Sequence, residues 1–148
     1  MQVNFFYQNN QHNYKKEIII FELCKVISTF LELPPTLDVC LYKLNTSYGG
    51  IDLLHINRIG IDYDIDYNQL PMILIHELIH VNQRKTGKLK ITPTGKYYWN
   101  GVYYTNVNPE NMTYQEYSTL PWEIDVSQRQ QQIFEEASRL IHSQVDKK

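Results

Sequence analysis

Two histidines and a glutamate stand within five residues of this chain, in the segment His76-Glu77-Leu78-Ile79-His80. On an α-helix, residues four positions apart lie on one face, with their Cβ atoms about 5–6 Å apart. Both imidazoles can therefore reach one tetrahedral zinc ion at about 2.0–2.1 Å. Glu77 would lie about 60° from His80 around the helix axis, beside the ion and outside its ligand set. The H-E-x-x-H spacing predicts a hydrolytic zinc centre with Glu77 as general base.

The neighbours of this pentapeptide favour a metal site over the simpler interpretation, an amphipathic helix with a polar stripe. Apolar residues precede it at 72–75, interrupt it at Leu78 and Ile79, and follow it at Val81. A helix that is apolar nearly all round is expected to be buried. Burying two histidines and a glutamate costs several kcal/mol unless these groups are paired or bind a metal. A bound metal would supply the partner that they need.

Length and charge restrict the classes of protein to consider. The chain has 148 residues, enough for one domain spanning residues 1–148, and no repeat or low-complexity linker divides it. A net charge of −2 and a pI near 6.2 give no electrostatic reason to expect nucleic acid or an anionic membrane as a partner. A short basic run is predicted to be the solvated end of the motif helix, with a substrate-facing patch as the alternative. This run consists of Arg84, Lys85, Lys88 and Lys90.

The two cysteines and the N-terminal segment bear on the cellular compartment. Cys24 and Cys40 stand among apolar residues and belong to no C-x-x-C motif, so we expect buried free thiols, with a single disulfide as the alternative. Residues 1–16 contain no continuous apolar segment, and no stretch of the chain approaches 18 apolar residues. We therefore expect neither a signal peptide nor a membrane span, and a cytoplasmic location.

Three helices are predicted from periodicity and boundary residues. Apolar residues follow a helical period over 13–32, before two prolines. The motif helix is expected to begin at Asn68 as N-cap and to end just before Gly87 as its C′ residue. Pro121 is expected to begin a last long helix that runs to about His142.

The strands are predicted between these helices. Residues 36–44 alternate in hydropathy, and residues 51–61 supply a second strand after a glycine turn. Asn100-Gly101 lies between aromatic residues in the segment 96–104, a strong β-hairpin signal. A polar loop over 106–111 follows. The order of helix, strands, motif helix, hairpin and helix predicts an α+β fold, with the metal between two helices that pack on a small sheet.

A catalytic zinc ion takes a third protein ligand and keeps a fourth position open for water. Glu123 is distinctive because it opens the last predicted helix between Trp122 and Ile124. The alternative is an ordinary first-turn glutamate that interacts favourably with the helix dipole. The other candidates lie in a polar loop, on the last helix or near its end. These are Glu110, Glu116, Asp125, Glu135, Glu136 and His142.

Two motifs in a fixed order resemble a known family. HELIH is followed by the aromatic hairpin and then by Tyr-x-x-x-Pro-Trp-Glu-x-Asp, which begins at Tyr117. This order, over roughly residues 69–126, is similar to small bacterial and bacteriophage metallopeptidases of the zincin type. The resemblance implies a minimal zincin-like fold with an N-terminal helix, a small mixed sheet, the HExxH helix, an aromatic hairpin and a C-terminal helix. It also implies a gluzincin-like site in which Glu123 is the third ligand beside His76 and His80.

The resemblance assigns two further roles and also shows two departures. Asp125 matches the second acid of the family motif, and we expect it to orient a ligating histidine through the other ring nitrogen. Val126 replaces the usual alanine, and no third histidine follows the HExxH motif. The missing histidine argues against families that use three histidines, including DNA-associated proteases.

The predicted function is zinc-dependent hydrolysis of a peptide or protein substrate, in a protein of bacterial, phage or prophage origin. Zincins use a hydrogen-bond donor for the oxyanion, and Tyr117 is the candidate nearest to the Pro-Trp-Glu segment. Tyr103, Tyr104 and Tyr114 are alternatives, although aromatic residues in a hairpin more often belong to a core. The competing hypothesis is a non-catalytic binding or scaffold protein with the same zinc-stabilised fold.

The zincin resemblance also places a peptide-binding edge strand just before the motif helix, around 54–58. His55 would then border the substrate cleft. The simpler interpretation, which we prefer, is a half-exposed histidine in a sheet.

Overall fold

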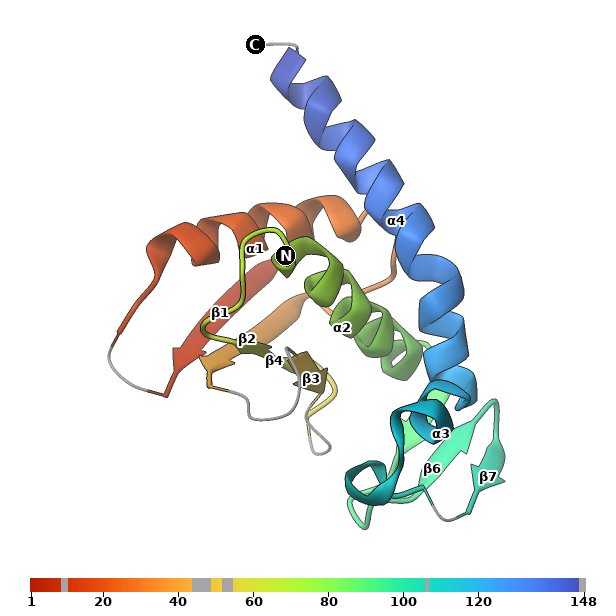
Figure 1. The fold of residues 1–148 in the computed structure, drawn as a ribbon. Coiled ribbons are helices and arrows are strands. Elements are labelled where there is room, and N and C mark those ends of the chain that lie inside the picture. Colours follow the sequence, from red (N-terminus) through yellow and green to blue (C-terminus); the bar gives the residue numbers. More distant parts are fainter. Residues whose placement is uncertain (9–10, 44–48, 52–54, 106, 147–148) are drawn as a thin grey trace.

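The computed structural model describes residues 1–8, 11–43, 49–51, 55–105 and 107–146, and it has an α+β fold (Figure 1). Helices pack on a four-stranded sheet, and a smaller three-stranded sheet lies beyond the end of the motif helix. In chain order the elements are β1 Gln2–Tyr7, α1 Tyr14–Ile27, β2 Thr36–Tyr42, β3 Gly49–Ile51, β4 Arg58–Asp62, α2 Leu70–Lys85, β5 Leu89–Ile91, β6 Tyr97–Trp99, β7 Val102–Tyr104, η1 Pro109–Asn111, α3 Tyr114–Ser118 and α4 Pro121–Asp146.

The larger sheet is mixed and has the strand order β1-β2-β4-β3. β1, β2 and β4 are parallel, and β3 pairs with β4 in the antiparallel direction at the edge. Alternate side chains on one face, such as Val39 and Ile61, enter a single core with residues of α1 and α2. Both helices therefore cover the same face of this sheet.

The N-terminal strand was not expected from the sequence, which predicted a helix as the first element. β1 precedes α1 and pairs in parallel with β2. Its inward residues Val3, Phe5 and Tyr7 alternate along the strand and pack against the core. That alternation is a strand signal, but it is short, and the exposed Phe6 interrupts the pattern of polar outward residues.

The motif helix α2 is largely buried, as its apolar surroundings predicted. Leu74, Ile75, Leu78 and Ile79 are each fully buried. The predicted N-cap is wrong by one residue, since the helix begins after Gln69, which makes no capping bond with its side chain. The chain has already turned there, because the amides of Gln69 and Leu70 both donate to the carbonyl of Asp66. The helix ends before Gly87 as predicted.

The smaller sheet has the order β5-β6-β7 and contains the predicted hairpin. Asn100 and Gly101 have positive φ values of 50° and 81°, as a two-residue type I′ turn requires. The sequence did not predict β5, which pairs with β6. Trp122 lies at the centre of a second core, where the Tyr97 ring stacks on it at 5.2 Å and the Tyr104 ring meets it edge-on at 5.7 Å.

Helix α4 begins at Pro121 as predicted and packs against α2 and α1. Figure 1 shows its C-terminal part extending past the rest of the molecule. Its beginning, which carries Glu123, lies between the end of α2 and the smaller sheet. The short helix α3, just before it, was not predicted. It begins with a capping box between Thr113 and Glu116.

The single strand predicted over 51–61 is wrong. Its ends belong to β3 and β4, and residues 52–54 lie outside the described residues. His55 is exposed and precedes β4, so it is not a sheet residue. β4 is paired on both sides, so the edge strands of this sheet among the described residues are β1 and β3, and 54–58 is not an edge strand.

Two further predictions concern the thiols and membrane spans. Cys24 and Cys40 are both buried, and neither takes part in a disulfide, as expected. Burial raises the pKa of the Cys24 thiol to about 12. Among the described residues, every helix is too short or too polar to cross a bilayer.

Candidate metal centre

The structure brings His76, His80 and Glu123 together, with ligand atoms that all lie within 4.8 Å of one another. His76 Nε2 lies 3.4 Å from one carboxylate oxygen of Glu123, and His80 Nε2 lies 3.0 Å from the other. Ligands of a tetrahedral metal with bonds near 2.05 Å are about 3.4 Å apart. The spacing of the two histidines from Glu123 is therefore close to that of a coordination shell.

The two elements that carry the triad meet because their apolar faces pack together. His76 and His80 are one turn apart on α2, and their rings lie 5.0 Å apart. Glu123 stands in the first turn of α4, which packs against α2. The adjacent Trp122 anchors this turn in the second core, where only 3% of its surface is exposed. The three side chains therefore meet between α2 and α4, and a metal ion at this place stays a prediction.

Gln83 holds one of the histidines, and the sequence analysis did not identify it. It is fully buried, and its Nε2 donates to the carbonyl of Trp122 and to Asp125 Oδ2, both at 2.9 Å. These two bonds orient the amide so that Gln83 Oε1 lies 2.8 Å from His80 Nδ1. An amide oxygen only accepts, so this network assigns the imidazole proton to Nδ1. Nε2 is then left with a lone pair directed at Glu123.

The lone pair on His80 Nε2 shows whether these residues are suited to bind a cation. Glu123 Oε1 is buried and has no hydrogen-bond donor of regular geometry among the described residues. Its neighbour at 3.0 Å is His80 Nε2, which carries no proton in the neutral ring. Two lone pairs at this distance repel unless a proton or a metal ion lies between them. The donor set therefore fits a metal ion, held by His76, His80 and Glu123.

The charges of the site shift its pKa values as the contacts predict. Burial alone would raise the pKa of Glu123, but the contacts with His76, His80 and Tyr117 hold it well below its usual range. Burial alone would lower the pKa of His80, yet the Glu123 carboxylate more than offsets this and raises it. Glu123 is therefore ionised, which is the form that binds a metal.

Glu77 lies beside the triad and is not one of its ligands. Only 6% of its surface is exposed. Burial raises the pKa of Glu77, although the neighbouring His80 and His76 oppose this effect. A buried carboxyl group next to a candidate metal-binding triad is unusual for a purely structural site, which needs no base.

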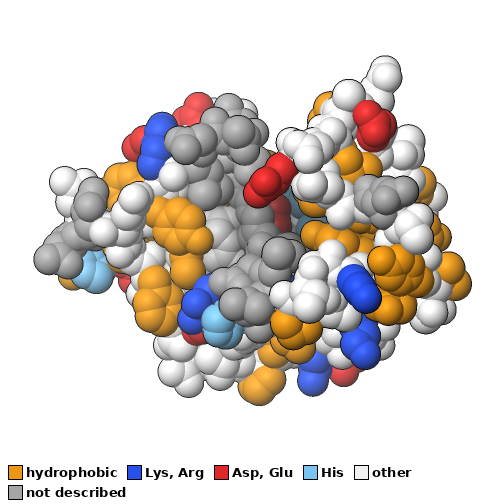
Figure 2. All heavy atoms as spheres, turned by 90° about the horizontal axis from the view of Figure 1, so that it is seen from below, with side chains coloured by type: hydrophobic (Ala, Val, Ile, Leu, Met, Phe, Trp, Pro, Cys, Tyr) orange, Lys and Arg blue, Asp and Glu red, His pale blue; other side chains and the backbone are white. Residues whose placement is uncertain are grey.

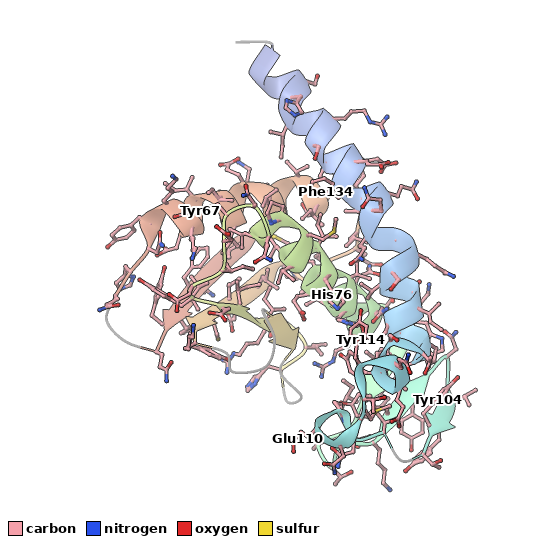
Figure 3. All side chains as sticks on the ribbon, in the orientation of Figure 1. Tyr67, His76, Tyr104, Glu110, Tyr114 and Phe134 are labelled. Atoms are coloured by element: carbon pink, nitrogen blue, oxygen red, sulfur yellow. The ribbon has the colours of Figure 1, made fainter. Side chains whose placement is uncertain are left out.

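Of the four candidate tyrosines, the structure brings Tyr117 into the site. Its hydroxyl is hydrogen-bonded to the carboxylate of Glu123, and burial together with that charge raises the pKa of Tyr117. Tyr114 is 84% exposed, and Figure 3 shows it on the short helix before α4. Tyr103 is exposed on the hairpin, and Tyr104 packs on Trp122.

The remaining candidates lie outside the triad. Asp125 was expected to orient a histidine ring directly. This prediction is wrong, because Gln83 lies between Asp125 and His80 and Asp125 accepts a hydrogen bond from Gln83. The other carboxylates and His142 are not part of the metal-binding group. In the basic run, Lys85, Lys88 and Lys90 are exposed as predicted, but Arg84 is buried near Tyr97.

A cavity of about 550 Å³ opens beside the triad. His80, Tyr117 and Glu123 form its wall at the metal site, and the smaller sheet and the loop before α3 form the rest. In Figure 2, the face seen from below is hollowed near its centre, with acidic side chains at the edge of the hollow. The candidate site is therefore open to solvent on one side, although two of its three ligands are buried.

No protein-family model, no curated protein and no solved structure matches this chain.

Proposed function

We propose that this protein is a zinc-dependent hydrolase of peptide bonds. The observation that carries the proposal is the combination of a His76, His80 and Glu123 triad with a buried carboxyl group, Glu77, that is not a ligand. Two histidines and a glutamate are the ligand set of one class of catalytic zinc site, in which the fourth position is open. A site that only stabilises the fold has no use for Glu77.

The chain's own residues would divide the chemistry between them. A zinc ion, when bound, lowers the pKa of a water molecule toward 7 and polarises the scissile carbonyl group. Glu77 would accept the proton of the attacking water and return it to the leaving amine nitrogen. Glu123, held ionised by its neighbours, and the neutral His80 would hold the ion.

Tyr117 has two possible roles in this scheme. Its hydroxyl binds Glu123 and borders the cavity, so it can orient that ligand. If the hydroxyl turned toward the substrate, it would donate a hydrogen bond to the oxyanion that develops on the carbonyl oxygen. The contact of the hydroxyl with Glu123 supports the first role.

A test separates metal binding from catalysis with two variants. Glu77→Gln is expected to keep one metal ion per chain and to lower the rate of peptide hydrolysis by about 100- to 10,000-fold. Glu123→Ala is expected to lose the metal. Metal content by plasma mass spectrometry and cleavage of a mixed peptide library measure the two effects. Glu135→Gln, at an exposed position on α4, is the matched control for Glu77→Gln.

Each outcome assigns the site to one class. Hydrolysis that survives in Glu77→Gln would refute its role as general base. An unchanged metal content in Glu123→Ala would remove it from the ligand set. A wild-type protein that binds zinc but cuts no peptide would support the competing hypothesis of a zinc-stabilised binding or scaffold protein.

A further inference from the structure

The cavity beside the candidate metal centre is lined mainly by residues that lie between α2 and α4 in the sequence. It begins at His80 and Glu123 and extends to Glu110. Figure 3 shows Glu110 apart from His76, in the part of the molecule that holds the smaller sheet. A volume of about 550 Å³ lies within the range of about 300–1,000 Å³ that is usual for ligand pockets. A group bound at the metal can therefore extend a large substituent into this space.

The walls next to the metal centre are apolar and rigid. Leu89 and Trp122 line the cavity, and 1% and 3% of their surfaces are exposed. Tyr97 also lines it, and its ring stacks on Trp122 at 5.2 Å, which fixes both rings in place. Val107 completes this wall from the loop after the hairpin. Such a preformed apolar surface favours a bulky apolar side chain, because little conformational entropy is lost on binding.

The far end of the cavity has a different character. Glu110 is exposed and carries a negative charge at the rim, next to Asn108 and Pro109. Among the described residues that line the cavity, no lysine or arginine balances this charge. An acidic group entering the cavity would meet the negative charge of Glu110 at the end away from the metal centre. The repulsion between like charges there disfavours an acidic occupant.

We propose that this cavity selects the substrate residue next to the scissile bond. The preferred residue has a large apolar side chain, aromatic above all, and Glu110 discriminates against acidic residues. Val107 sets the size limit, since it is half-buried and forms a wall without belonging to the central stack of rings. This inference rests on the proposed function, because it takes the metal as the anchor of the scissile group.

A series of amino-acid hydroxamates tests the cavity without requiring hydrolysis. The hydroxamate group chelates the metal, and the amino-acid side chain then probes the adjacent space. Dissociation constants for the zinc-loaded protein are measured by calorimetry with the phenylalanine, leucine, alanine and aspartate compounds. We expect the phenylalanine compound to bind about tenfold or more tightly than the alanine compound, and the aspartate compound to bind most weakly.

Two variants test whether Val107 and Glu110 determine the preference among the hydroxamates. Val107→Trp fills the cavity, so the preference for phenylalanine over alanine should fall to about one while alanine hydroxamate binds as before. Glu110→Lys should improve binding of the aspartate compound by about two- to fivefold, the effect of one exposed ion pair. Glu135→Lys changes charge by the same amount outside the cavity and should alter none of these constants. Zinc content and circular dichroism check that each variant is folded and loaded.

The results distinguish the two proposals. Equal binding of all four compounds, or a phenylalanine preference that survives Val107→Trp, would overturn the assignment of the cavity, whatever the peptidase assay shows. Absence of hydroxamate binding by the zinc-loaded protein would overturn it as well. Selective binding that responds to Val107 and Glu110, in a protein that cuts no peptide, would support the cavity and refute the proposed hydrolase.

Discussion

His76 and His80 are one turn apart on the same helix, yet they lie in different surroundings. The side chain of His80 is 4% exposed, and its second ring nitrogen is held by Gln83. The side chain of His76 is 32% exposed, and no comparable support for its ring is found among the described residues. The inner side of the candidate metal centre is thus fixed by packing, and the outer side faces solvent.

This difference matches what a catalytic centre requires. Water and substrate must reach the metal from one side, and the ligands must be held from the other. The support on the inner side comes from α4, through Trp122 and Asp125, and not from α2 alone. The two helices therefore position the histidines unequally, although the histidines are equivalent in the sequence motif.

The largest effect should appear when each histidine is removed from the metal-free protein. His80→Ala removes the neighbour of the buried Glu123 Oε1 and the hydrogen-bond partner of Gln83 Oε1, and it is expected to lower the free energy of unfolding by about 3 kcal/mol. His76→Ala removes a half-exposed ring and is expected to cost less than about 1 kcal/mol. Urea denaturation in the presence of a chelator measures both values. Equal losses would show that the inner and outer sides are not distinct.

The local part of the site could be predicted from the sequence. His76, Glu77 and His80 fall on adjacent faces of one helix wherever that helix lies, so their spacing alone defines their geometry. Glu123 was identified because an acid between Trp122 and Ile124 is unusual and because the segment resembles a family motif. The contact between Glu123 and the histidines depends on the packing of α4 on α2, which no single segment encodes.

The role of Gln83 could not be predicted from the sequence, because its partners are distant in the chain. Trp122 and Asp125 lie 39 and 42 positions away from it. The available signal was its position three residues after His80, on the same side of the helix. We assigned the supporting role to Asp125 from the family motif, and the structure shows that Asp125 acts on His80 only through Gln83.

The fold shows the same contrast between local and distant determinants. The hairpin at Asn100-Gly101 was predicted because its turn residues specify it locally. β1 and β5 were missed because each is short and owes its conformation to a partner strand elsewhere in the chain. Strand propensity is context-dependent in this way, so short strands are the elements that sequence patterns predict least well.

An intermediate effect is expected from Gln83. Gln83→Ala removes the acceptor of His80 Nδ1 and should weaken zinc affinity by about 10- to 100-fold. Gln83→Glu keeps an acceptor but loses the donor to Trp122, so it should restore part of the affinity. Competition with a chromophoric chelator measures the constants, and Gln128→Ala, at an exposed site on α4, is the control. If Gln83→Ala bound zinc as tightly as the wild type, Gln83 would not be needed to orient His80 for zinc binding.

The smallest effect should come from Asp125, one step farther from the metal. Its carboxylate accepts hydrogen bonds from Gln83 at 2.9 Å and from Arg129 at 2.8 Å. In Asp125→Ala, Gln83 still donates to the carbonyl of Trp122 and stays oriented, so zinc affinity should fall by less than about tenfold. The loss of stability should be about 1 kcal/mol, because Arg129 keeps its bond to Asn82 and is partly exposed.

Comparing the losses of zinc affinity in Gln83→Ala and Asp125→Ala shows whether Asp125 orients His80 directly or through Gln83. If Asp125 oriented His80 directly, as the family motif implies, Asp125→Ala would weaken zinc binding at least as much as Gln83→Ala. If the orientation passes through the amide, Gln83→Ala must be the more damaging change, and the double variant should bind zinc no more weakly than Gln83→Ala alone. Non-additivity of this kind is expected of residues that act in series on one ligand.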